Sequence, residues 1–106
     1  MAKYMFIASY TAEGAKGVIK EGGTSRREAV ATAMASAGGS LESFYFGFGA
    51  DDAYVDADFP DHAAAAAASL TVSAAGTSQV RTVVLLTPEE IDAAAQRSVD
   101  FRPPGN

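Results

Sequence analysis

A chain of 106 residues, 48% of them hydrophobic, can form one domain around one core; we expect this domain over residues 1–98, followed by an extended tail over residues 99–106. The absence of cysteine excludes disulfides, thiolate nucleophiles and cysteine-ligated metals, and it fits a cytoplasmic protein. A net charge of −5 with scattered basic residues excludes a nucleic-acid platform, and no apolar run approaches the roughly 20 residues of a membrane span.

Alternating apolar side chains predict a first strand over Lys3–Tyr10. The next stretch, Thr11–Gly22, is interrupted by glycines but starts like a helix, with Thr11 as a candidate N-cap and Glu13 in the first turn. Gly22-Gly23 interrupts this pattern, so the chain is expected to break here before the next helix.

A clearer helix is predicted after this break. Thr24 or Ser25 is its expected N-cap, and Glu28 stands three residues after Ser25, as in a capping box. The apolar stripe of this helix has helical spacing, ends before Gly38-Gly39, and consists of Val30, Ala33, Met34 and Ala37.

The aromatic stretch Leu41–Asp61 predicts two strands, about Leu41–Phe48 and Ala53–Phe59, around an acidic corner at residues 49–52. At period two, one face of the first of these strands carries Phe44, Phe46 and Phe48, and the other carries Leu41, Ser43 and Tyr45. Because both faces hold large apolar groups, we expect this strand to lie between two layers.

The second half of the chain predicts a helix, a strand and a short helix. An alanine-rich helix opens after Pro60-Asp61 and ends near Ala74, and alternation predicts the fourth strand over Ser78–Leu86. Thr87-Pro88-Glu89-Glu90 is a strong helix start, because an N-cap threonine precedes a proline and two carboxylates.

The order strand–helix–strand–strand–helix–strand predicts an α+β, ferredoxin-like fold: a four-stranded antiparallel sheet with helices on one face. Neither face of the first, second and fourth strands is polar throughout, so the face without helices needs a cover. We therefore expect two sheets to pair into a dimeric α/β barrel, with the protein itself as the partner in a homodimer or higher homo-oligomer. A pocket for a small-molecule ligand can form between the sheet and the helices.

Five segments of the chain resemble the GYD-domain family of small bacterial and archaeal proteins: K-Y-M-F-I-A-S-Y-T-A-E-G, E-G-G-T-S-R-R, F-Y-F-G-F-G-A-D-D, V-L-L-T-P-E-E-I and S-V-D-F-R-P-P-G. The resemblance covers essentially the whole chain. It implies a fold similar to the dimeric α/β barrels, and it implies no particular activity. The family takes its name from a Gly-Tyr-Asp signature; Gly49 and Asp52 occupy its Gly and Asp positions here, and Asp51 stands where the Tyr is expected.

Four residues are candidates for catalysis: Tyr45, Asp52, His62 and Arg81. His62, the single histidine, could act as a general base oriented by Asp61 or Asp58, or it could be a surface or capping residue. Arg81 lies in the middle of an apolar strand, so we expect it to point into a sheet face or an interface. Its expected partners there are Asp52, Asp56 and Glu42.

An anion site is expected near the start of the second helix, where Arg26 and Arg27 follow Lys20. The alternative is surface pairing with Glu21 or Glu28. Four aromatic residues could line a pocket or fill a core: Tyr4, Tyr10, Tyr45 and Phe46.

The remaining polar residues predict neither a metal nor a cofactor. The aspartates of this region could supply a general base or hold a hard cation, but a solvated strand face with a turn before it is the more ordinary interpretation; they are Asp51, Asp52, Asp56, Asp58 and Asp61. Three functions stay open: a small oligomeric ligand-binding or stress-associated protein, a cofactor-free isomerase or monooxygenase acting on an aromatic or carbonyl compound, and a structural assembly unit. In the last, the tail around Phe101 could strap onto a neighbouring subunit.

Overall fold

The computed structural model describes residues 1–105. Its elements follow in the order β1 (Ala2–Tyr10), α1 (Ala12–Glu21), α2 (Gly23–Ser36), β2 (Ser40–Phe46), β3 (Ala53–Phe59), α3 (His62–Ala74), β4 (Ser78–Leu85) and α4 (Pro88–Ala95). The predicted tail begins at Val99, and only Asn106 of that tail lies outside the described residues.

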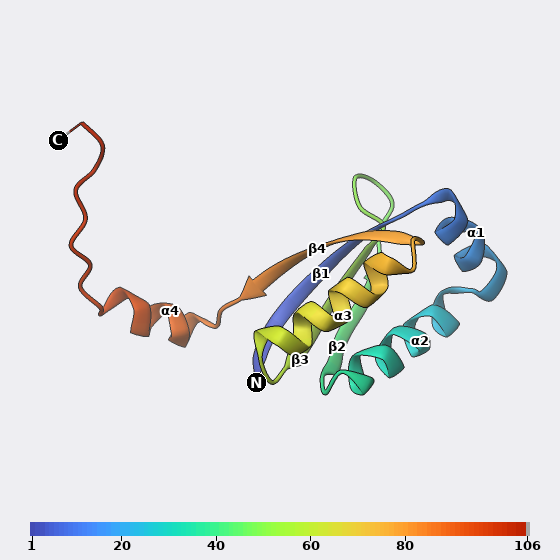
Figure 1. Cartoon of the computed structure of the whole chain (residues 1–106), viewed down its shortest axis with the longest axis horizontal. Coiled ribbons are helices and arrows are strands. Elements are labelled where there is room, and N and C mark those ends of the chain that lie inside the picture. The colour runs from blue at the N-terminus through green and yellow to red at the C-terminus, as the bar shows by residue number, and fades with distance from the viewer. Residues whose placement is uncertain (106) are drawn as a thin grey trace.

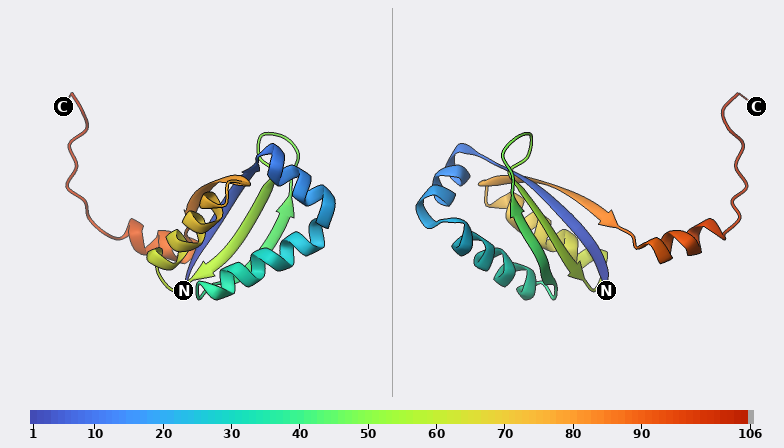
Figure 2. Two further views of the ribbon diagram at one scale, coloured as in Figure 1. Left: turned by 45° about the vertical axis from the view of Figure 1, so that its right-hand side comes forward. Right: turned by 180° about the vertical axis from the view of Figure 1, so that it is seen from behind.

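The four strands form one antiparallel sheet in the order β2-β3-β1-β4, with α2 and α3 on one of its faces (Figures 1 and 2). This confirms the predicted ferredoxin-like α+β fold. The pairing of two sheets into a barrel stays a prediction.

The core lies between the sheet and these two helices. Its buried members are Tyr4, Phe6, Met34, Val55, Ala57, Phe59, Ala65 and Ala68. The ring of Phe59 is fully buried, and its centroid lies 6.0 Å from that of Tyr4 and 5.9 Å from that of Phe6, both edge-to-face. Because Ala65 and Ala68 are small, α3 approaches the sheet closely there.

The opposite face of the sheet has no helix over it and is called the open face below (Figure 2). Side chains alternate across a strand, so the neighbours of the core residues point to this face. It comprises Lys3, Met5, Ile7 and Ser9 of β1, Tyr54, Asp56 and Asp58 of β3, Ser43 and Tyr45 of β2, and Gln79, Arg81, Val83 and Leu85 of β4.

The predicted helix caps are partly confirmed. Thr11 caps α1 by accepting a hydrogen bond from the N–H of Gly14, and Thr87 and Glu90 form a full capping box on α4. The predicted cap of α2 is wrong. Its N-cap is Gly22, at φ 87°, so Thr24 and Ser25 lie inside the first turn and form no box with Glu28. Gly22 takes a backbone conformation that a threonine or serine rarely adopts.

The predicted faces of β2 are also partly wrong, because the strand contains a bulge between Leu41 and Ser43. An extra residue there reverses the alternation, so Leu41 and Phe44 both pack against the core, while Ser43 and Tyr45 remain on the open face. The strand also ends at Phe46, which leaves Phe48 in the following loop and fully exposed.

Candidate functional site

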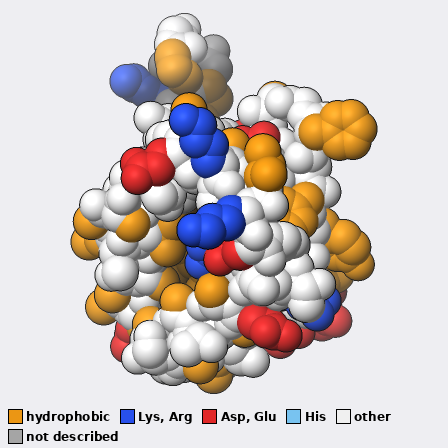
Figure 3. All heavy atoms as spheres, turned by 90° about the vertical axis from the view of Figure 1, so that its right-hand side faces the viewer, with side chains coloured by type: hydrophobic (Ala, Val, Ile, Leu, Met, Phe, Trp, Pro, Cys, Tyr) orange, Lys and Arg blue, Asp and Glu red, His pale blue; other side chains and the backbone are white. Residues whose placement is uncertain are grey.

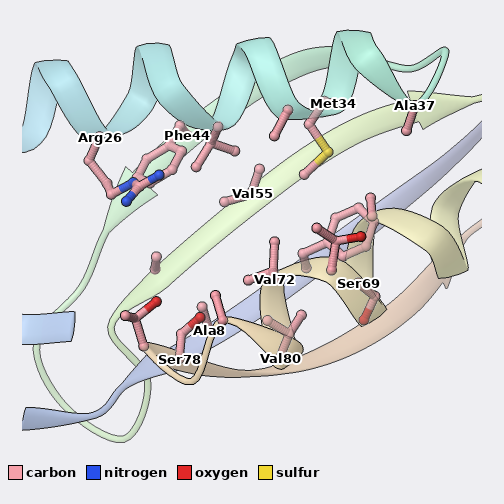
Figure 4. A pocket seen from close by; sticks show the side chains of 18 of the residues that line it. Ala8, Arg26, Met34, Ala37, Phe44, Val55, Ser69, Val72, Ser78 and Val80 are labelled. Atoms are coloured by element: carbon pink, nitrogen blue, oxygen red, sulfur yellow. The ribbon is translucent and has the colours of Figure 1, made fainter. Parts of the chain in front are cut away.

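A cleft of about 520 Å³ lies between α2, α3 and the helix-covered face of the sheet (Figure 4). It exists because α2 packs against β2 and α3 packs against β4, without substantial contact between the two helices. Most of its lining is apolar and small, with Ala33 and Val30 on α2, Val72 on α3, and Phe44 and Val55 on the sheet. The structure thus has the pocket that the predicted fold allows.

Arg26 gives this apolar cleft a polar end. Its side chain extends from the first turns of α2 into one end of the cavity, while Met34 and Ala37 lie at the other end (Figure 4). Within residues 1–105 its only ion pair is with Glu21, over an N–O distance of 3.5 Å. Figure 3 shows the molecule from the end where α1 lies: basic side chains lie near the centre of this view with acidic side chains beside them, and apolar side chains lie mostly towards its edges.

Tyr10 also lines the cleft and lies close enough to Arg26 for the guanidinium charge to act on its phenol. Burial raises the pKa of its phenol; Arg26 lowers it, and Asp52 and Glu21 raise it further. The net pKa is above the ordinary value of a tyrosine. Tyr10 therefore stays protonated at neutral pH, so its hydroxyl can donate a hydrogen bond to a ligand.

Asp52 of the family signature has a structural position beside this site. One of its carboxylate oxygens accepts a hydrogen bond of 2.7 Å from the backbone N–H of Tyr10. Its own N–H donates to the carbonyl of Ala8, and its carbonyl accepts from the N–H of Gly47. Asp52 thereby fastens the β2–β3 loop to the end of β1. Gly49 lies in that loop, exposed, with open space around its Cα.

His62 is the exposed first residue of α3. Its Nδ1 shares a hydrogen bond of 2.6 Å with the hydroxyl of Tyr4. The expected orienting carboxylates are engaged elsewhere: Asp61 accepts from the N–H of Ala64 as the cap of α3, and Asp58 pairs with Lys3 at 3.3 Å. The partner of His62 is therefore a core tyrosine.

Arg81 points to a sheet face, as predicted, namely the open face, but its partner within the chain is not the expected Asp52, Asp56 or Glu42. Its side chain is 65% exposed and pairs with Asp51 at 3.0 Å. Asp51 also accepts a hydrogen bond from the hydroxyl of Ser9. Arg81 is exposed because β4 is an edge strand and its open-face side chains have no covering layer.

The four catalytic candidates do not form one site. Tyr45 is 70% exposed on the open face, beside Tyr54 of the neighbouring strand. Asp52 and His62 flank opposite ends of β3, and its seven residues span about 20 Å. A proton-transfer mechanism needs its groups within hydrogen-bond reach, so these residues cannot act together within one chain.

The anion-site candidates are separated as well. Arg26 lines the cleft, whereas Lys20 and Arg27 are exposed and do not line it. Of the four aromatic candidates for a pocket, Tyr10 alone lines this cleft. Tyr4 is in the core, Tyr45 is on the open face, and Phe46 lies outside the cleft and stacks edge-to-face on Phe44.

The acidic residues of β3 form hydrogen bonds and ion pairs on the open face. Asp56 accepts from the hydroxyl of Ser43, and Lys3 pairs with both Asp58 and Glu42. The hydrogen bond between Asp58 and Glu42 raises the pKa of Glu42 and lowers that of Asp58. In the part of the chain that is described, no three His, Asp or Glu side chains converge as a metal site would require.

Helix spacing gives a second signal for Arg26, besides its charge. Arg26 lies four residues before Val30, so the apolar stripe of α2 extends back to it on the same helix face. An arginine at the end of an apolar stripe is a candidate polar end of a buried cavity. The residues across the cleft, such as Val72, have no such signal because only tertiary packing brings them opposite α2.

Comparison with known proteins identifies the family. None of the helices within residues 1–105 has both the length and the apolar character of a membrane span. No match to a curated protein or to a solved structure was found for this chain. The model of the GYD domain matches residues 4–95. Since this match spans most of the 106 residues, the chain belongs to the GYD-domain family.

Proposed function

We propose that this GYD-domain protein binds a small apolar molecule that carries one anionic group. The observation that supports the proposal is the cleft of about 520 Å³, whose lining is mostly apolar and which has Arg26 at one end. A volume of roughly 300–1,000 Å³ with few convergent polar groups is typical of small-molecule sites. The apolar body of the ligand would lie between α2 and α3, and its anionic group would meet the guanidinium.

Two polar groups at this end complement an anion. The guanidinium of Arg26 offers several N–H donors in one plane, a geometry that suits a carboxylate or sulfonate. Its ion pair with Glu21 is long and lies at a half-exposed position, so a ligand can compete for it. The protonated hydroxyl of Tyr10 provides a further donor.

Catalysis has less support, because the acid–base candidates are distributed over three places on the molecule. A role in stress responses stays a prediction, since no structural feature favours it.

Two fluorescent probes with the same type of aromatic skeleton test the proposal. 1-Anilinonaphthalene-8-sulfonate carries an anionic group, and N-phenyl-1-naphthylamine lacks it. We expect wild-type protein to bind both, and Arg26→Met to weaken binding of the sulfonate roughly tenfold, the loss of one charged hydrogen bond. Affinity for the neutral amine should stay unchanged, and Arg27→Met, one residue along, should change neither.

A second variant checks the location. Ala33 lines the cleft at an exposed position on α2, so Ala33→Trp should block the cavity without disturbing the core. We expect it to abolish binding of both probes while the near-ultraviolet circular dichroism of the fold persists. Undiminished binding to Ala33→Trp, or equal loss of both probes with Arg26→Met, would contradict the proposal.

A further inference from the structure

The C-terminal arm, defined here as residues 86–105, stands apart from the rest of the molecule. Every residue of the arm is exposed, and α4 packs against no other element of the described chain to any substantial extent. Figures 1 and 2 show α4 and the tail projecting away from the sheet. The radius of gyration is 16.8 Å, whereas a compact chain of this length has about 13 Å.

The composition of the arm does not suit a free segment. Four apolar side chains along it are between 51% and 81% exposed: Leu86, Ile91, Val99 and Phe101. In addition, α4 has only eight residues, and isolated helices shorter than roughly 12 residues are marginal in water. Its capping box secures only the first turn. Both facts indicate that α4 requires a packing surface outside its own chain.

The open face supplies such a surface next to the start of the arm. On β1 and β4 it carries an apolar strip formed by Met5, Ile7, Val83 and Leu85. Within this strip Ile7 is 9% exposed, although it is not part of the core under the helices, and Val83 is 40% exposed. Because β4 leads directly into Leu86, the arm starts at the end of this strip.

We propose that two copies of this chain pair by their open faces and exchange their arms. In a two-fold arrangement the same patch occurs on both subunits, so the strip of one copy meets the strip of the other. The arm of each copy then lies across the β2–β3 half of the partner's open face. That half presents the exposed rings of Tyr45 and Tyr54 as a docking surface for Ile91 and Phe101.

This inference is independent of the ligand site. The cleft is on the helix-covered side of the sheet, and the exchange uses the opposite side. An arm variant should therefore change the mass of the protein in solution and leave probe binding unchanged, whereas Arg26→Met should do the reverse.

Light scattering after size-exclusion chromatography measures the exchange. We expect the full chain to have twice its 10.9 kDa mass, and Ile91→Glu with Phe101→Glu to return it to the single mass. Leu70→Glu is the matched control, because Leu70 is 71% exposed on α3 and lies outside the arm and the strip. A monomeric wild-type chain at every attainable concentration, or a dimer that survives both arm substitutions, would overturn the proposal.

A spin label locates the arm without depending on those variants. The chain has no native cysteine, so Ala95→Cys gives a single labelling position on α4. Mixed with nitrogen-15-labelled wild-type chain, the nitroxide should broaden the amide signals of Met5, Ile7 and Tyr54 in the partner. No broadening, or broadening confined to α2 and α3, would contradict docking on the open face.

Discussion

Tyr4 joins the hydrophobic core to the polar surface within one side chain. Its ring is 2% exposed and packs edge-to-face against Phe59, while its hydroxyl reaches His62 at the start of α3. Buried tyrosines usually need such a partner for the hydroxyl. This contact ties β1 to α3 across 58 positions of sequence.

Replacing Tyr4 by phenylalanine should lower the free energy of unfolding by about 1 kcal/mol, the typical net contribution of one hydrogen bond. Urea denaturation measures it. Tyr45→Phe is the control, because the Tyr45 ring is 70% exposed and none of the described hydrogen bonds involves its hydroxyl. The same stability for both variants would show that the contact with His62 contributes nothing.

Tyr10 should make the fold sensitive to alkaline pH. The pKa of Tyr10 is raised in the folded protein, mainly because the phenol is partly buried. Once the pH exceeds the ordinary tyrosine pKa near 10, the folded state therefore binds more protons than the unfolded state. Stability present below that pH is therefore lost as the pH rises through the folded pKa. Urea midpoints at increasing alkaline pH should fall less steeply for Tyr10→Phe than for wild type. Parallel curves for the two proteins would contradict this role of Tyr10.

At the level of elements, the junction of α2 and β2 depends on its two glycines. Gly38 has φ 86°, and the N–H of Gly39 closes the helix by donating to the carbonyl of Met34. A Cβ on Gly39 would lie 2.6 Å from the Phe59 ring and 2.8 Å from the carbonyl oxygen of Asp58. The close approach of the chain at this point lets the fully buried ring of Phe59 pack directly against the junction.

Gly39→Ala should therefore destabilise the protein by roughly 1–3 kcal/mol, the usual cost of overpacking. Gly17→Ala is an informative comparison, because Gly17 is inside α1 with open space where a Cβ would lie. Alanine there should stabilise by about 0.5–1 kcal/mol through its better helix propensity. Denaturant midpoints of the two variants should move in opposite directions. A shift in the same direction would show that the contact with Phe59 is not what requires glycine at position 39.

At the scale of the whole molecule, local signals in the sequence predict most of the fold. Strand alternation, the caps Thr11 and Thr87 and the glycine stops each depend on neighbouring residues, and the ferredoxin-like order follows from the elements they define. The bulge after Leu41 is different, because it depends on how β2 pairs with β3. The bulge places the side chain of Leu41 on the same sheet face as Phe44, which alternation with period two does not predict.

The candidate site was less predictable, because its parts come from distant segments. The sequence predicts Arg26 as a cation of an anion site, but the turn of α2 directs Arg27 elsewhere, and Lys20 belongs to a different helix, α1. The position of Arg81 in an apolar strand predicts that it points to a sheet face, but its partner there is Asp51 of the β2–β3 loop. The packing of the loop against the sheet decides which carboxylate lies beside Arg81, and no single segment encodes that.

The position of β4 at the sheet edge has a consequence for solubility. An edge strand presents unpaired N–H and C=O groups that can template another chain. The end of β4 and the next residue read Thr82-Val83-Val84-Leu85-Leu86, an uncharged segment rich in β-forming residues, which is the composition of aggregation-prone stretches. Arg81, which is charged, directly precedes this segment. Pro88, which has no backbone N–H to donate, follows two positions after it. Flanking residues of these two kinds oppose the addition of further strands in a fibril. This role is separate from ligand binding and from the pairing of two chains.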